Sequence, residues 1–290
     1  MGRFIRCGVL VLGLFGSLTT HAASPVWELR GKHNTVYLAG SIHMLKASES
    51  QLPAGFEKAY KESEALVMEV DLDDLDPMEA QGWMMTNARF PAGKTLLDAL
   101  GKERYDLVAA EAGKLGVPIE GLAQFEPWMI ALTLVQLEYM KLGFNPEQGV
   151  EKQLERRAVA DQKEITGLET LPEQLGLLDG MSAEDQAKFL ELTVNELENV
   201  ERETDLLLAA WRGGNLSKLD QLHTEEYDAF PGLFKTLVAD RNKRWMPALQ
   251  KLLTEEKKDY LVVVGALHLV GKEGLLDMMQ AQGIKARQLQ

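Results

Sequence analysis

Cysteine is nearly absent from this sequence. The only one among 290 residues is Cys7. It lies in an N-terminal segment with the features of a removable secretion signal, so we expect the mature chain to contain no thiol. Without thiols, the chain can form no disulfide, no thiolate metal site and no cysteine nucleophile.

Positive charge is also scarce. The sequence has 31 Lys and Arg residues against 44 Asp and Glu residues, a formal net charge of −13. The basic residues are scattered and form no basic patch. A chain this acidic repels polyanions, which excludes nucleic acid and anionic lipid as main partners. The 46% hydrophobic content is ample for a folded core, and there is neither a low-complexity linker nor a solenoid repeat.

The first 23 residues predict secretion. Two arginines precede an apolar run at 7–18, and small residues follow as far as Ala23, which is the pattern of a cleavable signal peptide. An apolar run of about a dozen residues is too short to cross a bilayer of roughly 30 Å as a helix. We expect this segment to be removed, after Ala22 or Ala23, on export across the inner membrane. The mature protein is then periplasmic and has no stable membrane span. The alternative is an N-terminal anchor that is not cleaved.

Residues 24–290 predict a single α/β domain. An N-terminal β-hairpin is expected at Val26–Arg30 and 35–39, and further strands at 65–71, 163–170 and 260–264. Helical patterns fill about 76–160 and 182–256 between the central strands, including one long helix from Ser182 to about Trp211. Strands separated by helices favour a mostly parallel sheet flanked by helices, joined by right-handed crossovers.

Two buried-type strands end in the same motif. Gly-x-x-His occurs at 40–43 and again at 265–268, placing His43 and His268 just beyond an apolar run. Glu69 and Glu169 lie at the ends of two other predicted strands. In open α/β sheets, ligands bind beyond the carboxyl ends of the strands. The sequence therefore predicts that these four side chains converge at one rim of the sheet.

Two imidazoles with one or two carboxylates suit a divalent transition metal. This nitrogen and oxygen donor set fits Mn, Fe, Co or Zn and does not choose among them. The glycine of each motif allows backbone or substrate to approach closely. Arg241 concentrates positive charge with Lys243 and Arg244. One interpretation places these three residues on a helix surface, and the other gives Arg241 a role in the site.

The paired motifs and several other segments resemble the TraB/GumN family, which is related to the Tiki proteases. The resemblance spans nearly the whole mature chain and rests on residues 27–29, 40–43, 66–71, 167–170, Arg241-Asn242 and 264–271. It implies metal-dependent hydrolysis of a peptide or protein substrate, with manganese or cobalt favoured and zinc or iron as alternatives. At 149–151 the family more often has aspartate where this chain has Glu151, so the role of Glu151 is open.

The resulting hypothesis assigns a role to each candidate residue. His43, Glu69 and His268 hold the metal, and Glu169 either completes its ligand shell or acts as the general base. A divalent ion lowers the pKa of a water molecule and polarises the substrate carbonyl. Arg241 stabilises the developing oxyanion or orients a ligand carboxylate.

Two other classes of function stay open. Imidazole is also an axial ligand of haem, so the same histidines suit a non-catalytic periplasmic protein that binds haem, a metal or a small ligand. An interaction protein built on a degenerate enzyme scaffold is the third reading. The substrate and the oligomeric state are not specified by the sequence.

Overall fold

The fold is built on one six-stranded sheet. The computed structural model describes residues 23–71, 76–227 and 230–290, so the predicted signal segment lies outside the described residues except for Ala23. The strand order is β6-β4-β7-β2-β1-β8. The strands are β1 (Val26–Arg30), β2 (Thr35–Ser41), β4 (Ala65–Val70), β6 (Glu164–Glu169), β7 (Tyr260–Gly265) and β8 (Ala286–Gln288).

The sheet is parallel at its centre and antiparallel at one edge. β7 pairs in parallel with β2 and with β4, and β4 pairs in parallel with β6. β1 pairs antiparallel with both β2 and β8. The three central strands are apolar and buried over nearly their whole length, as expected when helices cover both faces of a sheet. The predicted mostly parallel sheet with an N-terminal hairpin is confirmed.

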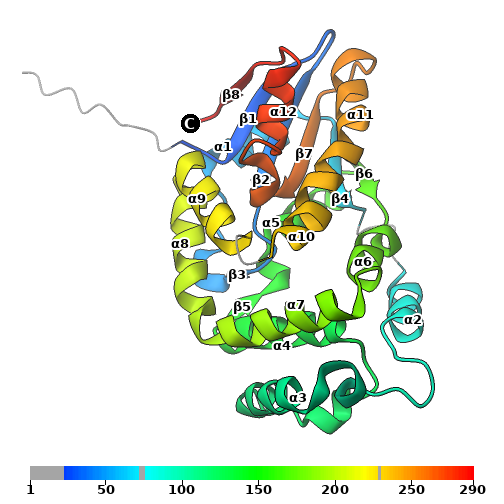
Figure 1. Ribbon diagram of the computed structural model, residues 1–290. Coiled ribbons are helices and arrows are strands. Elements are labelled where there is room, and N and C mark those ends of the chain that lie inside the picture. The colour runs from blue at the N-terminus through cyan, green and yellow to red at the C-terminus, as the bar shows by residue number, and fades with distance from the viewer. Residues whose placement is uncertain (1–22, 72–75, 228–229) are drawn as a thin grey trace, which may run out of the picture.

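Helices cover both faces of the sheet. α11 (Asp240–Thr254) and α12 (Leu275–Ala281) lie in front of it in Figure 1, and α1 (Ala54–Glu62) and α5 (Val150–Ala160) lie behind it. The sheet and these helices share one hydrophobic core.

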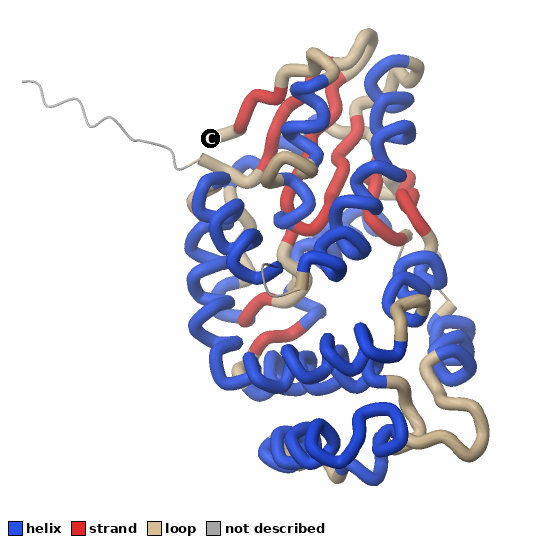
Figure 2. The backbone as a smooth tube through the Cα atoms, in the orientation of Figure 1, coloured by secondary structure: helices blue, strands red, loops and turns tan. Residues whose placement is uncertain are grey.

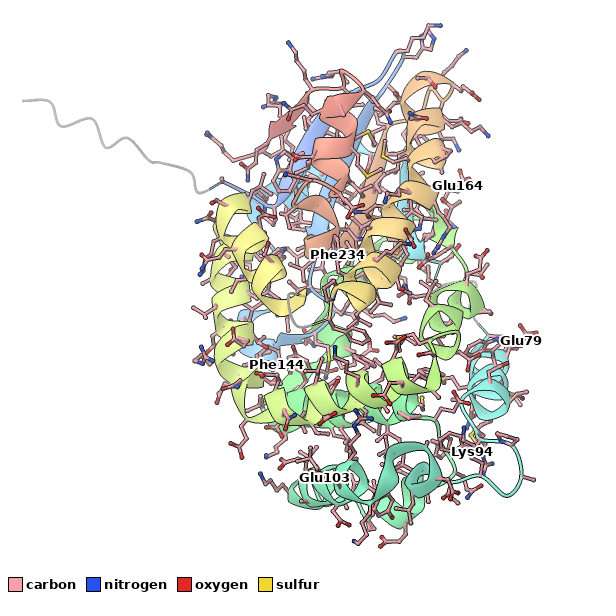
Figure 3. The ribbon with its side chains drawn as sticks, in the orientation of Figure 1. Glu79, Lys94, Glu103, Phe144, Glu164 and Phe234 are labelled. Atoms are coloured by element: carbon pink, nitrogen blue, oxygen red, sulfur yellow. The ribbon has the colours of Figure 1, made fainter. Side chains whose placement is uncertain are left out.

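A second group of helices lies below the sheet in Figures 1 and 2. It has its own apolar core, formed by residues such as Leu96, Ile130 and Leu190. Charged side chains such as Glu79 and Glu103 cover its outer surface (Figure 3). The helices in this region are α2 (Pro77–Asn87), α3 (Leu96–Lys114), α4 (Pro127–Lys141), α6 (Leu171–Asp179) and α7 (Ala183–Glu196). Two further helices, α8 (Val200–Arg212) and α9 (Leu216–Tyr227), stand at the left of Figure 1 and contribute Trp211 and Leu219 to the core of the sheet.

The predicted long helix from Ser182 to Trp211 is wrong. It is divided into α7 and α8 by a short 3₁₀ turn, Leu197–Asn199, at which the chain changes direction (Figure 2). Leu197 is buried in the core of the lower helices, whereas Trp211 is buried in the core of the sheet. One straight helix would not bury residues in both cores, so packing overrides the continuous helical pattern.

Two further details concern the shorter elements. α3 consists of two helical segments that meet at Gly101, where the backbone is not helical and φ is 72°. A two-stranded sheet of β3 (Leu45–Lys46) and β5 (Phe144–Asn145), which the sequence did not predict, joins the segment after His43 to the segment before α5. Within the described residues, we find no helix with the length and apolar character needed to cross a membrane.

Candidate functional site

The parallel sheet places the two Gly-x-x-His motifs side by side. β2 and β7 are neighbours, and Ser41 is paired with Gly265. His43 and His268 therefore follow adjacent strand ends, although more than two hundred residues separate them in the sequence. Glu69 lies near the end of β4, on the other side of β7. The carboxyl ends of these parallel strands point toward the lower helices in Figure 1.

Gly265 lies at the centre of this arrangement. A Cβ atom added there would be 3.3 Å from Glu69 Oε1, 3.5 Å from His268 Cδ2 and 3.9 Å from His43 Nε2. Three of the four predicted side chains therefore border one small volume, the space that a Cβ atom of residue 265 would fill. We call this volume the Gly265 cradle. The fourth residue, Glu169, reaches the site through Arg241.

Arg241 links the two carboxylates. Its Nη2 donates to Glu69 Oε2, and also to Glu169 Oε1 at 2.7 Å. Its Nε donates to the same Glu169 oxygen at 3.0 Å. The residue is only 6% exposed, so the helix-surface interpretation of Arg241 is wrong. A guanidinium can donate in several directions within its plane, which suits it to bridging two buried carboxylates.

The backbone before Arg241 has an uncommon form. A π-helical segment, Lys235–Ala239, immediately precedes α11, and the carbonyl of Leu237 in this segment accepts from Arg241 Nη1 at 3.0 Å. Such π-helical segments are often found at functional sites. The guanidinium also lies over the ring of Trp245, 4.6 Å from its centroid, which gives it a favourable cation–π contact.

His268 is buried and held by its neighbour on α11. The residue is 5% exposed, and its Nδ1 lies 2.7 Å from Asn242 Oδ1. The Asn242 amide donates to the carbonyls of His268 and Glu273, so Asn242 Oδ1 accepts from His268 Nδ1. That leaves His268 Nε2 facing Arg241 Nη1 at 3.0 Å and Glu69 Oε1 at 3.8 Å.

His43 is held differently. Its side chain is 70% exposed, and its Nδ1 lies 2.7 Å from Glu151 Oε1. The hydroxyl of Ser41 donates to the same oxygen. The charge of Glu151 raises the pKa of His43 from 6.5 to about 9. In the metal-free protein the pairing with Glu151 therefore favours the protonated ring, and a metal at Nε2 would have to displace the proton there.

Glu69 is ionised despite its burial. Burial alone would raise its pKa, but the electrostatic effects of His268, Arg241 and His43, together with the hydrogen bond from the Gly265 N–H, lower it to about 2. The Gly265 N–H donates to Glu69 Oε1 at 2.7 Å. Glu69 therefore presents a fixed carboxylate oxygen at the edge of the Gly265 cradle.

Glu169 lies behind Arg241. Besides the guanidinium, its carboxylate accepts from Trp245 Nε1 at 3.3 Å and from Gln174 Nε2 at 3.2 Å. Arg244, a half-exposed residue, lies 3.6 Å from the same carboxylate. These contacts make Glu169 the anchor that orients Arg241.

The metal prediction can be weighed on this geometry. Two imidazoles and a carboxylate around the Gly265 cradle have the donor chemistry that a divalent ion requires. Within the described parts of the chain, however, no three His, Cys, Asp or Glu side chains are grouped closely enough to hold an ion as they stand. Arg241 Nη1 occupies the position next to His268 Nε2. The cradle and the donor types fit a metal, whereas the present side-chain positions favour the guanidinium.

Sequence reasoning did not assign four side chains that shape the site. Glu151 and Asn242 hold the two histidines, while Gln174 and Trp245 hold Glu169. Asn242 follows Arg241 directly. Glu151 lies in segment 149–151, where this chain differs from the residue expected in the family. Both therefore lie in segments that the sequence analysis had already singled out. Gln174 and Trp245 carried no signal, because only the folded chain brings them to the strand ends.

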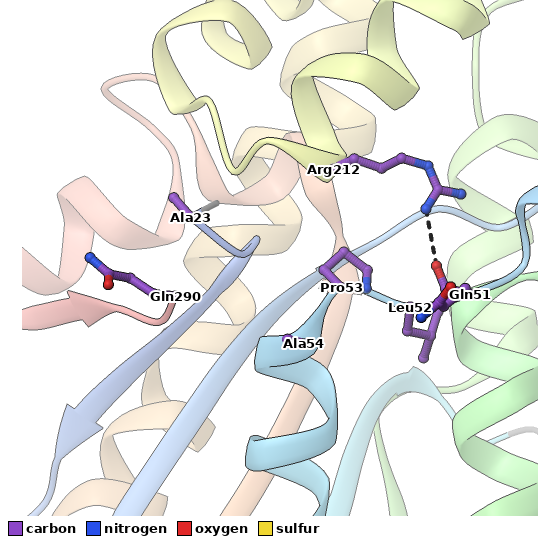
Figure 4. Close-up of a pocket in the computed structure, with 7 residues that line it drawn as sticks. All are labelled: Ala23, Gln51, Leu52, Pro53, Ala54, Arg212 and Gln290. Atoms are coloured by element: carbon purple, nitrogen blue, oxygen red, sulfur yellow. Dashed lines mark hydrogen bonds between the residues drawn. The ribbon is translucent and has the colours of Figure 1, made fainter. Parts of the chain in front are cut away.

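A separate pocket opens elsewhere on the surface. It has a volume of about 310 Å³ and contains none of the predicted site residues. Arg212 crosses it to donate to the carbonyl of Gln51 at 3.0 Å (Figure 4). Its walls come from Ala23, Gln51, Leu52, Pro53, Ala54, Arg212 and Gln290.

Comparison with known proteins identifies one family over most of the sequence. The sequence model of the TraB/PrgY/gumN family matches residues 25–288. The chain is 25% identical over 280 residues to "Uncharacterized protein YbaP" of Escherichia coli (strain K12) and of Shigella flexneri, covering 97% of this chain and 100% of those proteins. An "Uncharacterized protein" of Treponema pallidum (strain Nichols) is 22% identical over 293 residues, covering 94% of this chain and 85% of that protein. No solved structure matches.

Proposed function

Because the chain belongs to the TraB/PrgY/gumN family, we propose that it is a periplasmic metal-dependent hydrolase that cleaves peptide bonds. The observation that carries this proposal is the meeting of His43, Glu69 and His268 around Gly265. Residues with the chemistry of metal ligands and general acid–base groups border one small volume at the carboxyl ends of parallel strands, where ligands of such sheets bind.

The proposal gives the divalent ion three ligands of this chain: His43 Nε2, Glu69 Oε1 and His268 Nε2. When bound, the ion supplies Lewis acidity, which activates water and polarises a carbonyl. Manganese and cobalt are the first candidates, and zinc and iron share the same donor preferences.

The protein's own groups do the remaining work. Arg241 keeps Glu69 ionised and fixed through the donation from Nη2. Arg241 Nη1 faces His268 at the cradle, and in this proposal it donates to the oxyanion that develops on the substrate. Glu169 anchors Arg241 from behind, which favours a positioning role for this carboxylate over that of general base.

The test measures metal content and cleavage together. The protein is purified without a metal-binding tag, and bound metals are determined by elemental analysis. Hydrolysis of an unstructured fluorogenic peptide is then followed with added Mn²⁺, Co²⁺ or Zn²⁺. We expect His268→Ala to lose both bound metal and hydrolysis. The matched control is His33→Ala. It replaces an exposed histidine in the turn between β1 and β2 and should retain both bound metal and hydrolysis.

The ligand-binding alternative gives a different result in the same preparation. A Soret band on titration with haem that disappears in His268→Ala, with no metal-dependent cleavage by the wild type, would replace the hydrolase proposal. Bound metal unaffected by both His43→Ala and His268→Ala would end the metal assignment.

A further inference from the structure

We propose that Glu151 is the positioning residue for His43, and that its carboxylate fixes the ring so that Nε2 faces the Gly265 cradle. This inference rests on the proposed function for its consequence, but its structural part can be tested without any metal.

The first argument is the contact itself. Glu151 Oε1 lies 2.7 Å from His43 Nδ1 and also accepts from Ser41 Oγ. Ser41 ends β2, two residues before His43, so the strand that carries the histidine also holds the carboxylate. The nitrogen that pairs with a carboxylate leaves the other ring nitrogen for the site, and this determines which atom a ligand meets.

The second argument is how α5 is joined to the motif. The Val150 N–H donates to the carbonyl of Ile42 at 3.0 Å. A Cβ atom on Gly149 would lie 2.0 Å from the carbonyl oxygen of His43, so only glycine permits this approach of the two backbones. The N-terminus of α5 is therefore fixed against the histidine's backbone, and Glu151, in its first turn, cannot shift independently of His43.

The third argument is that, among the described residues, Glu151 makes the only hydrogen bond or ion pair to the His43 ring. The His43 side chain is 70% exposed. By contrast, His268 is buried against Trp245, with the two ring centroids 4.6 Å apart. Packing can orient His268, whereas His43 depends on its carboxylate.

The two histidines share one design. Each has its Nδ1 2.7 Å from a side-chain oxygen, on Glu151 for His43 and on Asn242 for His268. The other ring nitrogen then faces the site: His43 Nε2 lies 3.9 Å from the Cβ position at Gly265, and His268 Nε2 lies 3.8 Å from Glu69 Oε1. Groups that orient a metal-binding histidine in this way typically change metal affinity about 10- to 100-fold when they are removed. We expect an effect of this size at Glu151.

The structural test uses metal-free protein labelled with ¹⁵N at histidine. At neutral pH, a proton shared between His43 Nδ1 and a carboxylate should resonate downfield of an ordinary ring N–H. A His43→Gln variant assigns the signal. We expect Glu151→Gln to abolish it. Glu147→Gln should leave it unchanged, because Glu147 is an exposed residue close to the same helix that pairs with Arg156.

The functional test measures the dissociation constant for Mn²⁺ in the same variants. Glu151→Gln should raise it 10- to 100-fold, and Glu151→Asp, which keeps the carboxylate, should recover part of the loss and of the signal. A signal that persists in Glu151→Gln overturns the inference, as does unchanged Mn²⁺ affinity once the signal is lost. If the wild type binds none of Mn²⁺, Co²⁺ and Zn²⁺, the metal proposal fails, and the NMR result alone decides the role of Glu151.

Discussion

The two Gly-x-x-His motifs are similar in sequence but are held in opposite ways. His268 is buried, faces the buried cation of Arg241 and is hydrogen-bonded to the neutral amide of Asn242. His43 is largely exposed and is paired with the charged carboxylate of Glu151. The histidine near the end of the chain thus belongs to the rigid frame of the site. The histidine near its beginning lies on the solvent side and is held by one ion pair.

This difference separates structural from functional roles. A buried ion network is costly to disturb, because each remaining charge loses its partner in a medium of low dielectric constant. The His43–Glu151 pair is exposed on the histidine side only, since the side chains are 70% and 13% exposed, and water screens it more than it screens the fully buried network. We call His268, Arg241 and the two carboxylates that Arg241 bridges the His268 half of the site, and His43 with Glu151 the His43 half. Changes in the His268 half should therefore affect folding and function together. Changes in the His43 half should affect function with little effect on folding.

The largest expected effect is on stability, in the His268 half. Arg241→Met leaves Glu69 and Glu169 buried without their shared cation, so we expect a loss of about 3–5 kcal/mol in the free energy of unfolding. Arg244→Met, which alters a half-exposed arginine 3.6 Å from Glu169, should cost about 0–1 kcal/mol. Urea denaturation measures both changes. Equal losses in the two variants would contradict the distinction drawn here between buried and exposed charges.

The next largest effect is on activity and concerns Gly265, which lies between the two histidines. Gly265→Ala places a methyl group 3.3 Å from Glu69 Oε1, and the backbone at φ −51° and ψ 136° accepts alanine without strain. We expect a loss of hydrolysis on the order of a hundredfold and a stability cost of about 1–2 kcal/mol.

Gly113→Ala is the matched control for this change. Gly113 lies in α3 with nothing within 4 Å of an added Cβ atom, so this variant should retain activity and gain stability. Full activity in Gly265→Ala would show that the volume beside Gly265 is not used.

A smaller effect concerns the protonation of His43. Because the charge of Glu151 raises its pKa to about 9, an NMR titration of wild-type protein should give a midpoint near that value. In Glu151→Gln the midpoint should fall toward 6.5, the ordinary value for histidine. A midpoint near 6.5 in the wild type would mean that the ion pair does not persist in solution.

The smallest effect is the stability that this ion pair contributes. The pKa of His43 is higher in the folded chain than in the unfolded chain, so its contribution is fully present below pH 6.5 and is lost as the pH rises through about 9. Thermal unfolding of wild type and His43→Gln should therefore differ most at acidic pH and converge above pH 9. Solvent screening keeps the difference below about 1 kcal/mol. A difference that grows with pH would reverse the assigned sign.

Much of the frame was predictable from the sequence. Continuous apolar runs such as those ending at His43 and His268 can be buried only in a sheet covered on both faces. Their parallel pairing brings the two histidines and Glu69 together. The glycine at position 265 also predicted a feature of the site, because the Gly265 cradle lies where a side chain of residue 265 would be.

The remainder depends on contacts between distant segments. No local pattern distinguishes Arg241 from Lys243 or Arg244 on the same helix, yet only Arg241 points inward to the two carboxylates. Which of these three residues faces inward is determined by the side of α11 that is buried against the sheet. The break between α7 and α8 likewise follows from residues packed in two different cores, which a periodic pattern along one segment does not reveal.

The central claim is that His43 and His268 are two halves of one site, and a double-mutant cycle on Mn²⁺ affinity tests it most directly. His43→Ala, His268→Ala and the double variant are compared with wild type by equilibrium dialysis. Residues that serve one ion are coupled, so the double variant should lose less binding free energy than the two single losses added together. Losses that add, or single variants that bind Mn²⁺ as tightly as wild type, would contradict the claim.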